Sequence, residues 1–131
     1  MKIKLTALSM ALLVSGSVLA EDTIAKVKAS GIVTMGVRES SGALSYALAG
    51  GKYTGYHIEI CNRVVANLEQ AGGRKFEVKY QLVDSHNQLA HVHNGRVDLE
   101  CCRPTNNKTR QQEVAFLPTT FVEEVRSPVR L

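Results

Sequence analysis

The sequence predicts an α/β fold in which a short, mainly parallel sheet is flanked by helices. Segments with helical periodicity alternate along the chain with short β-branched or alternating apolar segments. Such alternation is typical of parallel strands joined by right-handed helical crossovers. The length of 131 residues, with 44% hydrophobic and 21% charged residues, is that of one globular domain and excludes a disordered or polytopic membrane chain.

The first 20 residues are typical of a secretory signal peptide. Two lysines, Lys2 and Lys4, precede an apolar run from Leu5 to Val14, and the small residue Ala20 ends the segment. The alternative is a buried N-terminal helix, but the run is short for a membrane span and its layout favours cleavage. Removing two lysines and no acid lowers the formal charge from +4 to +2. With scattered basic residues and 5% aromatic residues, we expect no nucleic-acid partner.

The first half of the mature chain predicts a short helix, a buried strand, a loop and a longer helix. Residues 21–29 have a helical pattern that Ser30-Gly31 ends, and residues 32–37 are apolar and β-branched. Residues 40–55 contain four glycines and predict a loop, with a short strand near residues 44–46. From Tyr56 a helix runs to Gly72-Gly73, with this apolar face: Ile60, Cys61, Val64, Val65 and Leu68.

The second half predicts two more strands around a helix. Phe76, Val78 and Tyr80 alternate with charged residues, which indicates a strand with one buried face. Asp84-Ser85 is expected to cap a helix that runs to about His93 with Leu89 and Val92 inward, and residues 97–99 form a short strand. Residues 113–122 resemble a strand that leaves the domain.

The polar residues that follow the strands predict a binding site. In open parallel sheets, ligands bind at the carboxyl ends of the strands, and these ends are residues 38–41, 83–85 and 101–107. Arg38 is the main candidate because a guanidinium can hold a carboxylate through two hydrogen bonds; the alternative is an ordinary solvated arginine. Hydroxyl groups of Ser40, Ser41, Ser85 and Thr105 would add donors, or would only cap turns.

Neither a metal site nor a catalytic site is predicted. His91 and His93 point in different directions on a helix, and no cysteine or acid completes a set with them or with His86. Asp98 and Glu100 alternate on a strand and therefore face opposite sides. The sequence contains no nucleotide-binding or hydrolase motif. We expect no cofactor.

The three cysteines predict one disulfide and one remaining thiol in an oxidising compartment. Cys61 lies on the inward face of its helix, and Cys101 ends a strand that would pack beneath it. Cys61–Cys101 is the preferred pair, which would leave Cys102 exposed in the cleft. A Cys102–His86 nucleophile is a remote alternative.

Four segments carry a resemblance to a known family. Residues 31–41 (GIVTMGVRESS), 55–61 (GYHIEIC), 94–101 (NGRVDLEC) and 105–116 (TNNKTRQQEVAF) resemble family 3 solute-binding proteins, the periplasmic receptors of amino-acid ABC transporters, and within them the glutamate/aspartate branch. The resemblance implies a type II periplasmic-binding-protein lobe, a periplasmic location, an amino-acid ligand and a membrane permease as partner. It also implies that Arg38, Ser85, Thr105 and Arg110 hold the ligand.

The chain departs from this branch at the implied site and in its length. Gln88 stands where the branch has an arginine, and Cys102-Arg103-Pro104 replaces a glycine, a serine and a threonine. Family members are considerably longer, so residues 21–116 are expected to form the first lobe and residues 117–131 a truncated hinge segment, with the second lobe missing. The complete set of expected ligand-binding residues is Arg38, Ser40, Ser85, Gln88, Arg103, Thr105 and Arg110.

The resulting hypothesis is a non-enzymatic receptor for a polar, acidic amino acid, with binding weakened or lost through truncation. One alternative is a non-functional remnant of such a receptor. The other is a periplasmic dehydratase or lytic enzyme on the same scaffold, for which Glu39 is the one tempting acid or base.

Overall fold

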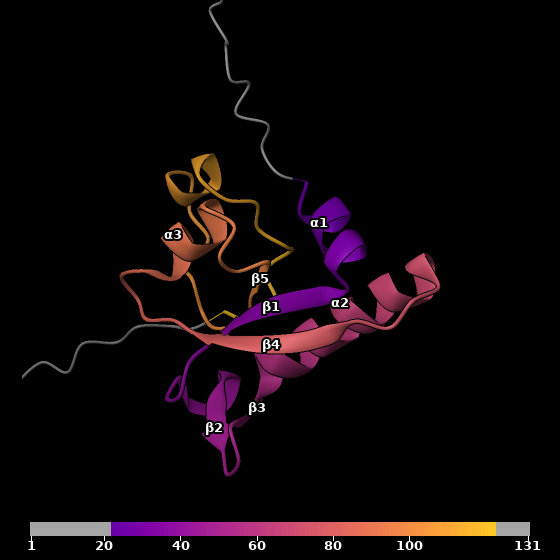
Figure 1. Ribbon diagram of the computed structural model, residues 1–131. Helices are drawn as coiled ribbons and strands as arrows, with labels where there is room; N and C mark the ends of the chain where they lie inside the picture. Colours follow the sequence, from indigo (N-terminus) through magenta and orange to yellow (C-terminus); the bar gives the residue numbers. More distant parts are fainter. Residues whose placement is uncertain (1–21, 123–131) are drawn as a thin grey trace, which may run out of the picture.

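The computed structural model describes residues 22–122, which form a small sheet with helices on both faces (Figure 1). The helices are α1 (Thr23–Ser30), α2 (Tyr56–Gly72) and α3 (Gln88–His93). The strands are β1 (Ile32–Val37), β2 (Tyr46–Leu48), β3 (Lys52–Thr54), β4 (Glu77–Leu82) and β5 (Leu99–Glu100), and the 3-10 turns are η1 (Gly42–Leu44) and η2 (Arg110–Gln112).

The main sheet is parallel and has the order β4-β1-β5. β1 pairs with β4 from Ile32 opposite Glu77 to Val37 opposite Leu82. On its other side, Met35 of β1 lies opposite Leu99 of β5. The predicted α/β class with a short parallel sheet is confirmed, and the central position of β1 explains its continuous apolar sequence.

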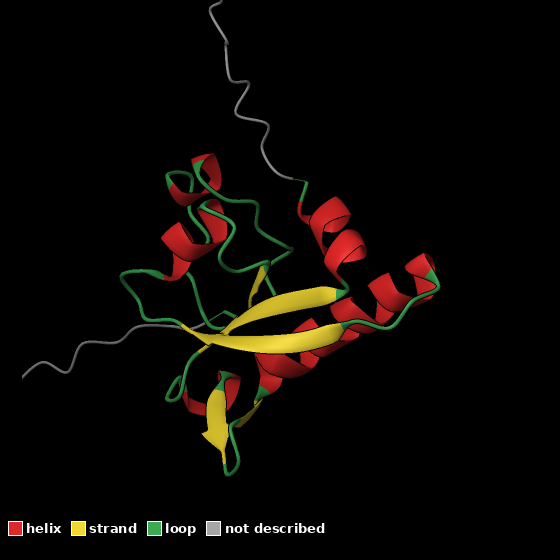
Figure 2. Cartoon of the chain, viewed as in Figure 1, coloured by secondary structure: helices red, strands yellow, loops and turns green. Residues whose placement is uncertain are grey.

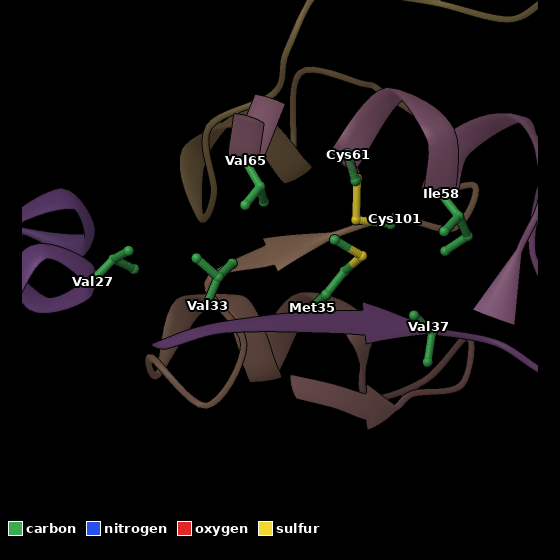
Figure 3. Close-up of a cluster of buried hydrophobic side chains, with 8 residues drawn as sticks. All are labelled: Val27, Val33, Met35, Val37, Ile58, Cys61, Val65 and Cys101. Atoms are coloured by element: carbon green, nitrogen blue, oxygen red, sulfur yellow. A yellow bond between two sulfur atoms is a disulfide. The ribbon is translucent and has the colours of Figure 1, made fainter. Parts of the chain in front are cut away.

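The main core lies between β1 and the helices α1 and α2 (Figure 3). Alternate residues of β1 point to one face, and every member of this cluster is 5% exposed or less: Val27, Val33, Met35, Val37, Ile58, Cys61, Val65 and Cys101. Burying one such aliphatic side chain stabilises the fold by about 1.5–3 kcal/mol. The cluster joins α1, β1, α2 and the residue that follows β5.

The opposite face of β1 is covered by α3 and the segment before β5 (Figure 2). A Cβ atom on Gly36 would lie 3.1 Å from Val97 Cγ1, so the small residue permits this close approach. Val97 belongs to a second buried cluster with Val83 and Cys102, against which Val92 of α3 packs. A partly buried ion pair, Lys26 Nζ to Asp98 Oδ1 at 2.9 Å, links α1 to this side.

The predicted long helix is confirmed as α2, although its buried face differs from the expected one. The buried residues are Ile58, Cys61 and Val65, whereas Ile60 and Val64 are only half-buried. Spacings of three and four residues place side chains on one helix face, and Ile58 extends that series toward the first turn. Gly73, in a left-handed conformation at φ 62°, ends the helix.

The short strand expected near residues 44–46, in the loop over residues 40–55, is found slightly later as β2, and an unexpected partner strand, β3, completes an antiparallel hairpin. β2 and β3 pair from Tyr46 opposite Thr54 to Leu48 opposite Lys52. The turn between them uses Gly50 and Gly51 at φ 78° and 72°, a conformation that glycine adopts without steric cost. The signal for the hairpin is this glycine pair, since the strands themselves are only three residues long.

Two other strand expectations are corrected. The predicted buried face of β4 forms only in its first half: Phe76 and Val78 are half-buried and pack against the main core, whereas Tyr80 is 39% exposed. The strand expected over residues 113–122 does not form, and this segment follows η2 as irregular chain. No helix within residues 22–122 is long and apolar enough to cross a membrane.

Candidate functional site

The loops that follow β1, β4 and β5 are the candidate site, as expected for a parallel sheet. Ser45 fixes the first of these loops, although sequence reasoning did not single it out. Its buried hydroxyl accepts from the Arg38 N–H at 3.2 Å and donates to the Arg38 carbonyl at 3.0 Å. The Ser41 N–H donates to the Ser45 carbonyl at 2.8 Å, so the chain folds back directly after β1.

A depression of about 330 Å³ lies between the ends of β1 and β4. It is lined by Arg38, Glu39, Ser40, Leu82, Val83, Asp84 and Asn87. The predicted residues Arg38 and Ser40 therefore lie in one concave surface, beside two carboxylates. Among residues 22–122, no hydrogen bond or ion pair occupies the Arg38 guanidinium, which is half-buried.

Asp84 lines this depression, and the sequence placed it in a strand-end segment of the site and as a helix cap without choosing it as a ligand residue. Its Oδ1 accepts from the N–H groups of His86 at 2.7 Å and Asn87 at 2.9 Å. These backbone N–H groups hold the pKa of Asp84 below its ordinary value, and the positive charge of Arg38 acts in the same direction. Because residues 84–87 form this hydrogen-bonded turn, α3 begins only at Gln88, later than expected.

A second depression of about 410 Å³ adjoins the first through Ser40. Its lining is Ser40, Ser41, Gly42, Ala43, Leu44, Tyr56, Arg103 and Phe121. Arg103, one of the expected ligand residues, thus lines the same depression as Ser40. Ser41 is 4% exposed, and its hydroxyl has no hydrogen-bond partner within the described chain.

The structure separates the remaining expected residues from these depressions. Ser85 is exposed in the turn between Asp84 and Asn87 but lines neither depression. Gln88 is buried in the first turn of α3, with its Oε1 unpaired by any described residue. Thr105 and Arg110 meet each other, since Arg110 Nη1 donates to the Thr105 carbonyl at 3.1 Å.

The predicted disulfide is confirmed. Cys61 of α2 is bonded to Cys101, with the two Cα atoms 6.2 Å apart, and Figure 3 shows the bond inside the main core. It ties the start of the third site loop to the helix behind the sheet. The pair was preferred because Cys61 lies on the inward face of its helix and Cys101 follows a strand that packs beneath it.

The expectation that Cys102 is exposed in the cleft is wrong. Cys102 is 2% exposed because it packs with Val83 and Val97 in the second cluster. Burial raises the pKa of its thiol far above the ordinary value, and the neighbouring Glu100 adds to the shift. The buried thiol lines neither depression.

A buried carboxyl lies beneath the loops. Burial raises the pKa of Glu100, while hydrogen bonds with Cys102 and the charge of Arg38 act against the rise. Glu100 Oε1 accepts from the Cys102 N–H at 3.2 Å, and the Cys102 carbonyl accepts from His57 Nδ1. Glu100 and His57 thus hold residue 102 from both sides, and no motif or spacing in the sequence indicated this role.

No group of three histidine, cysteine, aspartate or glutamate side chains within residues 22–122 could hold a metal ion. The lining of the two depressions presents guanidinium, hydroxyl and carboxylate groups. Such groups can bind a small zwitterion through charge-assisted hydrogen bonds.

The sequence matches one protein family over most of its length. Residues 33–129 match the bacterial extracellular solute-binding proteins, family 3. The chain is 37% identical over 111 residues to an L-glutamate/L-aspartate-binding protein of Pseudomonas aeruginosa, covering 81% of this chain and 37% of that protein. It is 33% identical over 108 residues to a glutamate/aspartate import solute-binding protein of Escherichia coli, covering 82% and 36%.

A solved structure has a similar fold. The solute receptor for L-cysteine of Neisseria gonorrhoeae aligns with a TM-score of 0.61 and 27% identity, over 71% of this chain and 37% of that one. The chain thus spans little more than a third of the length of the relatives that it matches.

Proposed function

The chain belongs to family 3 of the bacterial extracellular solute-binding proteins, and we propose that it binds a polar amino acid at the depression beside Arg38. Acidic amino acids are the proposed ligands, because the glutamate/aspartate-binding proteins are relatives at 33–37% identity. The proposed activity is binding, without a chemical step.

The Arg38 guanidinium at the end of β1 supports this proposal most directly. It lines a concave surface, and no residue within 22–122 forms a hydrogen bond or ion pair with it. A carboxylate is the group that a planar guanidinium binds best, through two parallel hydrogen bonds. The main chain of Arg38 is fixed by Ser45, so the guanidinium is carried by an ordered element.

The charges around the depression suit an α-amino acid. Asp84 stays ionised because its pKa is lowered, and Glu39 lies in the same lining. Arg38 would bind a ligand carboxylate while these carboxylates attract the ligand ammonium group. In the same proposal Ser40 supplies a hydroxyl donor in this depression, and Arg103 of the adjoining depression shifts the charge preference relative to the glutamate/aspartate branch. Ser85, Gln88, Thr105 and Arg110 line neither depression, so only the resemblance supports their proposed role.

We further propose the setting in which such binding would act. Residues 1–20 would be a cleaved signal peptide, residues 21–116 the first lobe of the binding domain and residues 117–131 a hinge segment. The protein would reside in the periplasm and deliver its ligand to the permease of an ABC importer. The leader and most of the hinge segment lie outside the described residues 22–122.

Affinity is expected to be low, in the millimolar range. The described loops contact a ligand from one side only, and ion pairs that remain open to water are weak. A chain that folds but binds nothing is the alternative, and the relation to longer receptors would then record ancestry.

Thermal unfolding of the full chain with each of four amino acids tests the proposal: L-glutamate, L-aspartate, L-glutamine and L-cysteine. L-cysteine is included because the receptor from Neisseria gonorrhoeae is described with it. A ligand present at ten times its Kd stabilises the folded state by about 1.4 kcal/mol. We expect the acidic amino acids to raise Tm by several degrees and the others to raise it less.

Two arginine variants test whether the ligand-dependent rise in Tm arises at Arg38. Arg38→Gln is expected to abolish the ligand-dependent rise in Tm, whereas Arg63→Gln, on the exposed surface of α2, keeps it. Equal Tm shifts in both variants would reject Arg38 as the binding group. A cooperative transition that no amino acid moves would support the non-binding alternative.

A further inference from the structure

The outer edge of β4 carries unpaired backbone groups. In a parallel pair, the N–H and C=O of one residue point to the same side and alternate along the strand. Glu77 and Val83 donate to Gly31 and Val37 at 2.8 and 3.0 Å, so odd-numbered residues bond toward β1. Even-numbered Val78, Tyr80 and Leu82 therefore point their backbone groups away from the sheet, where no strand of residues 22–122 pairs with them. Of these groups, the Leu82 carbonyl accepts from Gln81 Nε2 at 3.0 Å.

At the first residues of this edge, a side chain of α2 already uses one backbone N–H group. Glu69 Oε1 accepts from the Phe76 N–H at 2.8 Å, which leaves the Phe76 carbonyl but not its N–H for an additional strand. Side chains beyond that point are poorly covered: Tyr80 is 39% and Leu82 48% exposed. An edge with free backbone groups and exposed apolar side chains is a template for strand pairing.

The charges of β4 are self-complementary. Glu77 and Lys79 are exposed neighbours on the face opposite Val78, with Lys79 Nζ 4.0 Å from Glu77 Oε1. If a second copy pairs antiparallel with Val78 opposite Val78, each Glu77 lies opposite Lys79 of the other copy. Both charge pairs then occupy non-hydrogen-bonded positions, where facing side chains are closest.

The same arrangement matches the apolar face. Phe76 lies opposite Tyr80 of the second copy, and aromatic cross-strand pairs are favourable. Moving the twofold axis to residue 79 would place two lysines opposite each other. Moving it to Tyr80 would leave Glu77 opposite Val83, without a charge partner. Charge therefore selects the arrangement centred on Val78.

We propose that two copies of this chain associate through antiparallel β4 strands, with Val78 at the twofold axis. The pairing covers residues 75–81 and leaves the depression around Arg38 and Asp84, at the ends of the strands, open. It does not depend on the proposed amino-acid binding. Each dimer gains two Val78 hydrogen bonds, the Tyr80 N–H to Phe76 carbonyl bonds and two charge pairs.

Sedimentation of the full chain, expressed with its own N-terminal segment, tests this proposal. The wild-type chain is expected to show a concentration-dependent monomer–dimer equilibrium. Glu77→Lys and Lys79→Glu each convert both charge pairs to repulsions and are expected to weaken the dimer at least about tenfold. Lys108→Glu, a charge reversal at an exposed loop position, is the matched control and should dimerise like the wild type.

An equimolar mixture of the two variants, Glu77→Lys and Lys79→Glu, is the most decisive sample of this experiment. Within each variant the neighbours at 77 and 79 have like charges, but between the variants every facing pair is again opposite. The mixture is therefore expected to form a heterodimer although neither variant dimerises well alone. A monomeric wild type, unchanged dimerisation of either variant, or a mixture that stays monomeric would each overturn the proposal, provided that circular dichroism shows the variants folded.

Discussion

The core beneath β1 and the segment from residue 103 to residue 122 are built in opposite ways. The core collects side chains from α1, β1 and α2 with exposures of 5% or less, and a disulfide crosses it. None of residues 103–122 is buried, and the one regular turn among them is η2. Contacts such as Tyr56 Oη to the Thr120 carbonyl at 3.3 Å hold that segment.

This difference in burial distinguishes the scaffold of the fold from the surface that would bind an amino acid. Hydrophobic burial fixes β1 and α2, whereas polar and backbone contacts shape the loops at the carboxyl edge. Mutations in the core should therefore change the free energy of unfolding, and mutations at the edge should change ligand response with little effect on that free energy.

Loss of the disulfide is expected to have the largest effect. The double variant Cys61→Ala, Cys101→Ala removes a link between residues 40 apart in sequence and should lower the free energy of unfolding by about 4 kcal/mol. Urea unfolding with and without a thiol reductant measures it. The reductant should destabilise the wild type and leave the double variant unchanged; a reductant-insensitive wild type would argue against the crosslinked core.

The next effect is expected from Met35, which is fully buried at the centre of β1. Met35→Ala should cost about 2–5 kcal/mol through lost burial and a residual cavity. Leu117→Ala, at a side chain that is 54% exposed, is the matched control in the irregular segment and should cost less than about 0.5 kcal/mol. Similar losses for both variants in urea unfolding would erase the contrast between the two regions.

The same contrast explains which elements could be predicted from sequence. β1 was predicted with its observed bounds and the α2 region was found because burial imposes a period on apolar residues. The β2–β3 hairpin was missed, since its three-residue strands carry no period and only Gly50-Gly51 signals the turn. The strand expected near residue 116 failed because apolar residues alone do not form a strand where no partner strand is present.

A smaller, pH-dependent effect is expected at Glu100. Burial raises its pKa above the ordinary 4.5, so the folded state favours the protonated form. The stability from this preference is present below the unfolded pKa and is lost as the pH rises through the folded pKa. Glu100→Gln keeps an oxygen acceptor for the Cys102 N–H and avoids that loss.

The variant should therefore gain stability relative to the wild type as the pH rises from below 4.5 to 7. Thermal unfolding of both proteins across this range measures the difference in Tm. Glu113→Gln, at an exposed position, serves as the control and should show no such trend. A difference that shrinks toward pH 7 would contradict the buried, unfavourable carboxylate.

The candidate site was predictable only in part. The carboxyl ends of parallel strands and the guanidinium of Arg38 follow from sequence order and side-chain chemistry. The path of the loop after β5 beneath the site could not be predicted. This path determines the burial of Cys102 and Gln88 and the hydrogen bonds that His57 and Glu100 make with residue 102. Such loop paths are set by tertiary contacts that leave no periodic pattern in the sequence.

The central claim, that the carboxyl edge near Arg38 binds the carboxylate of an amino acid, is tested most directly by titration of backbone amide resonances with L-glutamate. Saturable shifts are expected at residues 38–41 and 84–87, with none at the outer edge of β4 or in the last turn of α2. Shifts confined to other regions, or no saturable shift at millimolar ligand in a folded protein, would contradict the claim.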